Sequence, residues 1–117
     1  MSELEKVLQA SIEEYTAGMH CSEVIFKNVT RAWRPDFDEG LVRIATPFGS
    51  GVADRGDVCG ALVGGLMVIG YLFGRRSLDE SQDPCWQLSR KFYDRFQETF
   101  RYTTCSQIKD RIPDWDE

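Results

Sequence analysis

The chain has 117 residues, of which 42% are hydrophobic and 28% are charged, with a formal net charge of −5. This length and composition are typical of a globular protein, so we expect residues 1–117 to form one domain. The acidic balance argues against nucleic acid or an anionic membrane surface as a partner. The first residues include no apolar signal segment, which predicts a cytoplasmic protein whose cysteines are reduced at rest.

Apolar residues recur at helical spacing in the first third of the chain. A first helix is predicted between the N-cap Ser2 and the stop signal Gly18, and its apolar stripe should face the core. That stripe consists of Leu4, Val7, Leu8, Ile12 and Tyr15. A second helix should run from Ser22 to about Trp33, burying Val24, Ile25, Val29 and either Ala32 or Trp33.

The middle of the chain is rich in glycine. Asp38 can cap a short third helix that should end before Pro47, and a glycine-rich loop follows over residues 48–56. A fourth, almost uniformly apolar helix is expected over residues 57–73, too short for a membrane span. Glycines at every fourth position (Gly56, Gly60 and Gly64) predict that another helix backbone packs closely against it.

Two further helices are predicted in the last third. The fifth begins at Asp83 and carries the apolar stripe Cys85, Leu88, Phe92, Phe96 and Phe100. The last helix should run from Thr104 to about Arg111, before an acidic tail over residues 113–117 that we expect to fray. The sequence therefore predicts an all-α, single-domain helical bundle of about five or six helices around a glycine-rich central helix.

All four cysteines (Cys21, Cys59, Cys85 and Cys105) fall where a helix is predicted to begin. A helix N-terminus presents free N–H groups and the positive end of the helix dipole, which favours a thiolate over a thiol. A thiolate is both a nucleophile and a soft metal ligand. Their placement therefore indicates redox or metal chemistry.

Packing is the alternative explanation for each cysteine, because free cysteine behaves as a small hydrophobic residue. Cys85 fits this explanation well, since it continues an apolar stripe, so it is the lesser redox candidate. Packing and function both remain open for Cys21 and Cys59. No CxxC pair occurs, so any site must be assembled from different helices, and the absence of CxxCH excludes covalent c-type haem. The only histidine, His20, is a lesser candidate as a metal ligand.

The ordered set of motifs resembles the C_GCAxxG_C_C family of redox-active proteins. The likeness is carried by residues 20–24, 48–51, 56–65 and 96–105, although the literal Gly-Cys-Ala order and a final cysteine are missing here. The resemblance implies a helical domain with redox or metal-associated cysteines. A related domain in split-Soret cytochromes implies an electron-transfer protein as partner.

The leading hypothesis places Cys21, Cys59 and Cys105 together at one end of the bundle. They would act as a reversible dithiol or as ligands to a soft metal or an iron–sulfur cluster. The competing hypothesis is a non-catalytic helical interaction module, forming a homodimer, in which the cysteines only fill space. A small-ligand site under the loop over residues 48–56 is a third reading.

Overall fold

The computed structural model describes residues 2–112, which form five α-helices and one 3-10 helix. The elements are α1 (Glu3–Ala17), α2 (Cys21–Trp33), η1 (Glu39–Phe48), α3 (Gly60–Phe73), α4 (Asp83–Phe100) and α5 (Cys105–Arg111). The only β-structure within residues 2–112 is one isolated bridge, so the all-α prediction is confirmed. None of the helices in this range combines the length and apolar character needed to cross a bilayer. The predicted fraying of residues 113–117 lies outside the described range.

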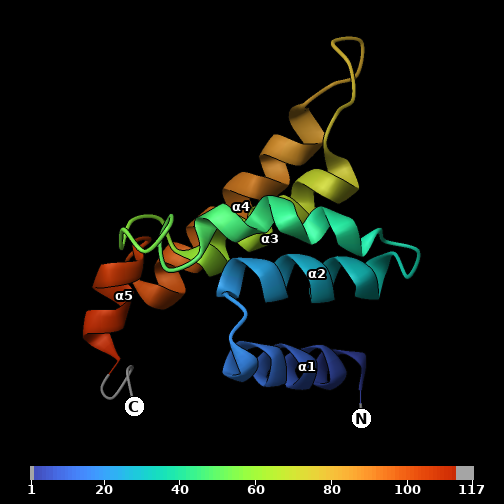
Figure 1. The fold of residues 1–117 in the computed structure, drawn as a ribbon. Helices are drawn as coiled ribbons and strands as arrows, with labels where there is room; N and C mark the ends of the chain where they lie inside the picture. Colours follow the sequence, from blue (N-terminus) through green and yellow to red (C-terminus); the bar gives the residue numbers. More distant parts are fainter. Residues whose placement is uncertain (1, 113–117) are drawn as a thin grey trace.

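Helix α2 lies between α1 on one side and α3 with η1 on the other, and α4 packs against α3 (Figure 1). The buried apolar side chains form two clusters. One joins α2, η1 and α3 through Phe26, Phe37, Val42, Ala45 and Val68. The other joins α3, α4 and α5 through Leu62, Phe96 and Ile108. This second cluster supports the end of the molecule at which α2, α3 and α5 begin.

The face that α1 presents to the core differs from the predicted one. Most of the predicted stripe is exposed: Leu4 at 68%, Leu8 at 52%, Ile12 at 64% and Tyr15 at 44%. Polar contacts hold α1 instead, because the Asn28 amide donates to Ser11 Oγ (3.1 Å) and to Glu14 Oε1 (2.7 Å), and Lys27 pairs with Glu14. The predicted burial was wrong because the side of α1 that faces α2 carries Val7, Ala10, Ser11 and Glu14, which are the partly buried residues of this helix.

Helix α2 begins at Cys21, and its predicted inner face is only partly correct. Val24 is buried, whereas Trp33 is 65% exposed and Ile25 and Val29 are half-buried. The buried set includes three polar residues and alternates along the helix: Ser22, Val24, Phe26, Asn28 and Thr30. Neighbours on more than one side of α2 explain why burial does not follow a single stripe.

The segments on either side of the glycine-rich loop also differ from the prediction. The third helix is a 3-10 helix that passes through Pro47 and ends at Phe48, because only one hydrogen-bond donor is lost so close to its end. Helix α3 begins at Gly60, three residues later than expected, since residues 57–58 are extended. Gly56 therefore lies in the loop, where its φ of 72° suits glycine.

Helix α4 begins at Asp83 as predicted, but its apolar stripe is only partly covered. Phe96 is buried, whereas Leu88 and Phe100 are 39% and 45% exposed. The reason is that α4 has α3 as its main neighbour, and no helix within residues 2–112 covers its outer side (Figure 1). The prediction that the whole stripe is buried was wrong.

Candidate thiol site

Three of the four cysteines line one small cavity. Cys21 is the first residue of α2, Cys59 is the N-cap of α3, and Cys105 is the first residue of α5. The cavity has a volume of about 50 Å³. Its other lining residues are Tyr15, His20, Ser50, Gly60, Ile108 and Lys109. Helix starts that are 38 and 46 residues apart in the chain thus bring their cysteines together.

An antiparallel bridge fixes Cys59 relative to Cys105. The Cys59 amide donates to the carbonyl of Thr103 (2.7 Å), and the Cys105 amide donates to the carbonyl of Asp57 (2.6 Å). In this register the two cysteines are diagonal neighbours on one face, a relation that places Cα atoms about 7–8 Å apart in an antiparallel pair. Since a disulfide needs Cα atoms within about 7 Å, joining two cysteines at this spacing requires the backbone to move.

Close contact between α2 and α3 brings Cys21 to the same place. A Cβ atom added at Gly60 would lie 3.2 Å from the Ser22 amide nitrogen, and one at Gly64 would lie 3.0 Å from the Ser22 carbonyl oxygen. Ser22 itself is buried, and its hydroxyl donates to the Ala45 carbonyl (2.8 Å). The prediction of close backbone packing is therefore right for Gly60 and Gly64. Gly56 lies in the loop and not in α3, but it too approaches a helix, since its added Cβ would lie 3.1 Å from Ser106 Cβ on α5.

The glycine-rich loop over residues 48–56 packs against the site. A Cβ at Gly49 would lie 2.6 Å from the His20 ring, and one at Gly51 would lie 2.7 Å from Cys105 Cβ. Five consecutive residues, 50–54, have positive φ. For residues other than glycine this conformation costs roughly 1–2 kcal/mol each. The loop that borders the cysteines is therefore strained, a property often found beside functional sites.

Burial dominates the electrostatics of the thiols. It raises the pKa of Cys21, and negative charge on Cys59 or Cys105 would raise that pKa further, while a backbone hydrogen bond and Lys109 oppose the change. Burial also raises the pKa of Cys105, against the opposing effect of Lys109. The expectation that the helix starts hold thiolates is therefore wrong for these two residues, because desolvation outweighs the helix-end effect.

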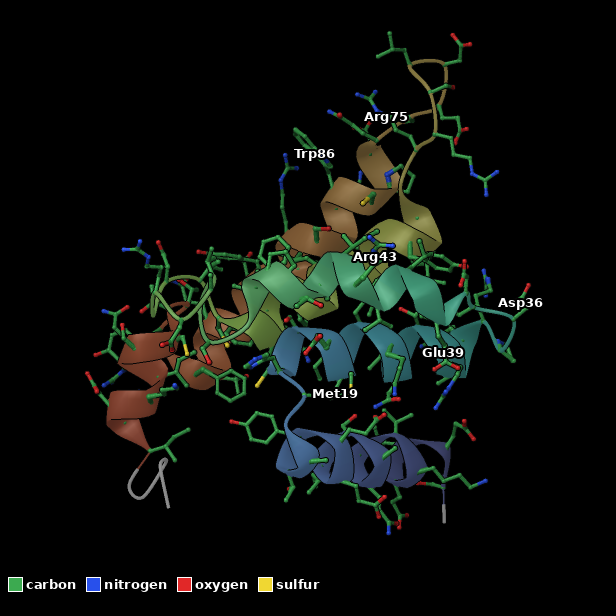
Figure 2. The ribbon with its side chains drawn as sticks, viewed as in Figure 1. Met19, Asp36, Glu39, Arg43, Arg75 and Trp86 are labelled. Carbon is green, nitrogen blue, oxygen red and sulfur yellow. The ribbon has the colours of Figure 1, made fainter. Side chains whose placement is uncertain are left out.

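The two lesser candidates from the sequence have different positions. His20 is the N-cap of α2 and lines the cavity, so it lies beside the three cysteines. Cys85 lies in the first turn of α4 and lines a separate surface hollow together with Leu66 and Trp86. In Figure 2, Trp86 and Met19, which precedes His20, mark how far apart these regions are. The structure does not bring Cys85 to the other cysteines.

Metal coordination would require the cavity to change shape. Within residues 2–112, no group of three or more His, Cys, Asp or Glu side chains is placed to hold a metal ion. The three cysteines share a cavity, yet their present arrangement is not a ready-made ligand set. Thiol chemistry needs no such set, since a disulfide joins only two sulfur atoms.

Sequence reasoning missed several residues of this cavity. Lys109 follows Cys105 by four residues on α5, a spacing that places both on one helix face and could have indicated it. Tyr15 was assigned to the apolar stripe of α1, and Ser50 to the loop. No local signal could have placed those two beside the cysteines.

The molecule is therefore a small helical protein in which three cysteines, each at the start of a helix, line one cavity. Residues 19–116 match the family described as "Putative redox-active protein (C_GCAxxG_C_C)". Because this match covers most of the chain, the protein belongs to the C_GCAxxG_C_C redox-active family. Helix α1 precedes the matched residues. No curated protein and no solved structure gives a significant match to the chain.

Proposed function

We propose that this protein is a cytoplasmic thiol redox protein in which Cys21, Cys59 and Cys105 form the reactive site. The observation that carries the proposal is that these three cysteines, from three separate helix starts, line one cavity. Two of the thiols would form a reversible disulfide, releasing two protons and passing two electrons to an acceptor. A partner electron-transfer protein or the disulfide of another protein could accept them.

The disulfide would join Cys59 either to Cys21 or to Cys105. Negative charge on Cys59 would raise the pKa of both Cys21 and Cys105, and the charge of Cys105 would raise that of Cys21 as well. Cys59 also has a fixed relation to each of the others, through the bridge to the start of α5 and through the contact between α2 and α3. We therefore assign Cys59 as the shared partner.

Dithiol chemistry fits the site better than a resident metal. Burial raises the pKa of Cys21 and Cys105 and so favours their neutral thiols, and a disulfide is also neutral, so oxidation does not bury a charge.

A soft metal or an iron–sulfur cluster is the second candidate function, and one observation favours it. The cysteines disfavour each other's ionisation, and a bound cation would offset that repulsion and release the thiol protons. In that state Cys21, Cys59 and Cys105 would be the ligands, with His20 beside them. The present spacing would have to change for this to occur.

The proposal can be tested on protein purified without oxygen. Metal content and the absorption spectrum are measured first, and the thiols are then titrated before and after treatment with a disulfide-forming oxidant. We expect the wild-type protein to lose two of its four thiols and to regain them on reduction. Peptide mapping should place Cys59 in the disulfide.

Two serine variants form the matched pair for this test. Cys59→Ser should abolish the disulfide, whereas Cys85→Ser should leave it intact, because Cys85 lies elsewhere. Four thiols that survive oxidation, in a protein without metal, would refute redox function and favour the interaction module. Bound metal or an iron–sulfur spectrum that is lost in Cys59→Ser would establish the second candidate instead.

A further inference from the structure

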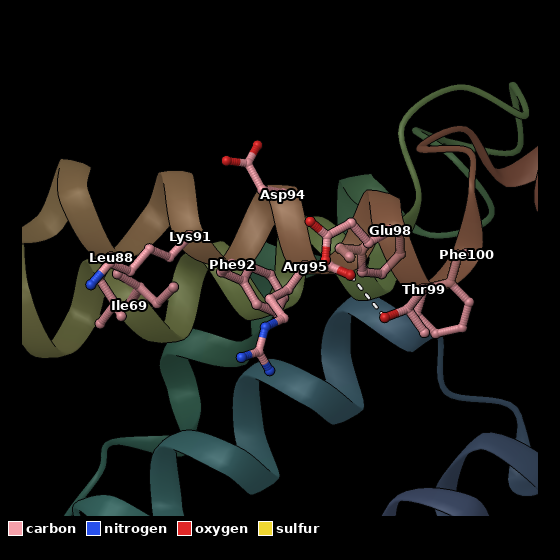
Figure 3. Close-up of a pocket in the computed structure, with 10 residues that line it drawn as sticks. Ile69, Leu88, Lys91, Phe92, Asp94, Arg95, Glu98, Thr99 and Phe100 are labelled. Atoms are coloured by element: carbon pink, nitrogen blue, oxygen red, sulfur yellow. Dashed lines mark hydrogen bonds between the residues drawn. The ribbon is translucent and has the colours of Figure 1, made fainter.

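Helix α4 borders an apolar groove that no other helix within residues 2–112 fills (Figure 3). The groove has a volume of about 770 Å³. Its apolar lining comes from α3 and α4: Ile69, Leu88, Phe92, Phe96 and Phe100. Leu88 and Phe100, which are 39% and 45% exposed, leave apolar surface open at the two ends of the groove. Such a surface is a candidate interface, and its chemistry indicates what covers it.

The apolar residues that α4 contributes are placed symmetrically along the helix. Leu88, Phe92, Phe96 and Phe100 are four residues apart and are centred on residue 94. If two copies of α4 pack antiparallel, with a two-fold axis beside residue 94, Leu88 of each copy lies opposite Phe100 of the other. These two positions are about 18 Å apart along the helix at 1.5 Å per residue, so both contacts form in the same pair.

The charged residues of the groove are placed so that each basic residue has an acidic counterpart. Lys91 and Glu98 lie at equal distances from the midpoint between residues 94 and 95, and so do Arg95 and Asp94. The same antiparallel pairing therefore places Lys91 of one copy opposite Glu98 of the other. In Figure 3 the carboxylate of Asp94 points away from the guanidinium of Arg95 and from the apolar residues. Lys91 and Glu98 are therefore the pair that should contribute most.

These four charges have no ion-pair partner within residues 2–112. The ion pairs of this range are Lys27–Glu14 and Arg31–Glu39. On α4 itself, the residues four apart carry like charges, Lys91 with Arg95 and Asp94 with Glu98, which is unfavourable within one helix. Opposite charges supplied by another molecule would offset this repulsion.

We propose that the α4 groove is a homodimer interface, in which α4 of one copy packs antiparallel against α4 of a second copy about a two-fold axis. One surface meets itself, so the assembly closes at two copies and every contact occurs twice. A surface that pairs with itself needs balanced charge, because any excess charge would face its own like. The groove has two basic and two acidic residues, in a chain whose formal net charge is −5.

Helix α1 also has exposed apolar residues, but it fits self-pairing less well. It carries four glutamates against one lysine, so two copies of α1 would repel each other. The α4 interface is independent of the proposed redox function, because no residue that lines the groove also lines the thiol cavity.

The first experiment is analytical ultracentrifugation of the full chain over a range of concentrations. Wild type should sediment as a reversible dimer of the 13.4 kDa chain. Leu88→Glu should raise the dimer dissociation constant by about 30-fold, the size of a typical interface hot spot. Tyr93→Glu is the matched control and should leave the dimer intact. Tyr93 is also on α4 and also 39% exposed, but it lines the separate hollow beside Cys85.

A mixing experiment tests the two-fold pairing itself. Lys91→Glu and Glu98→Lys should each weaken the homodimer by about 10-fold, because each places like charges opposite each other twice in every dimer. Mixed together, the two variants should form a heterodimer, since both positions then bring opposite charges together. Lys6→Glu makes the same change of charge on α1, and its mixture with Glu98→Lys should not recover the dimer.

Circular dichroism establishes that each variant is folded, and the mixing experiment does not depend on Leu88→Glu because it changes only exposed charged side chains. A wild-type monomer at all concentrations, an open-ended assembly, or a dimer that persists in Leu88→Glu would overturn the proposal. Failure of Lys91→Glu and Glu98→Lys to recover the dimer on mixing would also contradict it. None of these outcomes bears on the disulfide, which is measured separately by thiol titration.

Discussion

Replacing Gly64 by alanine should push α2 away from α3. The added Cβ would lie 3.0 Å from the Ser22 carbonyl oxygen, 3.1 Å from Ile25 Cβ and 3.2 Å from Ser22 Cα. Ordinary contacts are a few tenths of an ångström longer, and two of the three atoms belong to the α2 backbone. No side-chain rotation can relieve such a contact, so the helix itself has to move.

The size of the effect follows from two opposing terms. Alanine is better than glycine in a helix by about 1 kcal/mol, whereas overfilling a packed contact costs about 1–3 kcal/mol. Gly64→Ala should therefore leave the free energy of unfolding unchanged or lower it by up to about 2 kcal/mol. Gly70 lies in the same helix, and a Cβ added there would meet open space. Gly70→Ala should therefore raise the free energy of unfolding by about 1 kcal/mol.

Urea unfolding of the two variants isolates the packing cost, because both gain the same helical preference. The expected difference in unfolding free energy is about 1–3 kcal/mol, with Gly64→Ala the less stable. Gly64→Ala should also form less disulfide involving Cys21, since the contact with α3 holds Cys21 near Cys59. Equal stability of the two variants would refute the inferred role of this glycine.

Two pH dependences follow from the charges in the structure. Burial raises the pKa of Cys21 above its ordinary 9.0. The neutral thiol therefore stabilises the fold fully below pH 9.0, and this contribution is lost as the pH rises through the higher pKa that Cys21 has in the folded protein. Cys21→Ala should therefore flatten the alkaline fall in unfolding free energy, and an unchanged slope would contradict this. Burial pushes the pKa of Glu14 upward, but hydrogen bonds from Lys27 and Asn28 hold it below 4.5. Glu14 therefore contributes stability above pH 4.5 that is lost as the pH falls through the folded value, so Glu14→Gln should weaken the acid dependence measured by urea unfolding.

Local signals in the sequence identified most of the helices. Ser2 and Asp38 cap the helices that they were expected to cap, and Asp83 begins α4 as predicted. Thr104, expected as the first residue of the last helix, is its N-cap. Capping depends on residues within one turn, so the sequence specifies it directly. The start of α3 was placed too early because the extended pairing before Gly60 involves residues near position 104, far along the chain.

The direction in which each helix faces was less predictable. The period of apolar residues on α1 and α4 was read correctly as helical, but Leu8 and Phe100 remain exposed. A hydrophobic period indicates that a face favours burial, and it cannot say whether this chain or another copy supplies the cover. On α1, the polar contacts of Asn28 decide the orientation instead.

The sequence by itself determined the helical class and placed each cysteine at the start of a helix, because both depend on residues close together in the chain. Only the tertiary structure decided that Cys21, Cys59 and Cys105 share a cavity while Cys85 does not. It also decided that burial, rather than the helix ends, governs the pKa of Cys21 and Cys105. Which helix starts meet, and how much solvent they lose, depends on packing between distant segments that local patterns do not encode.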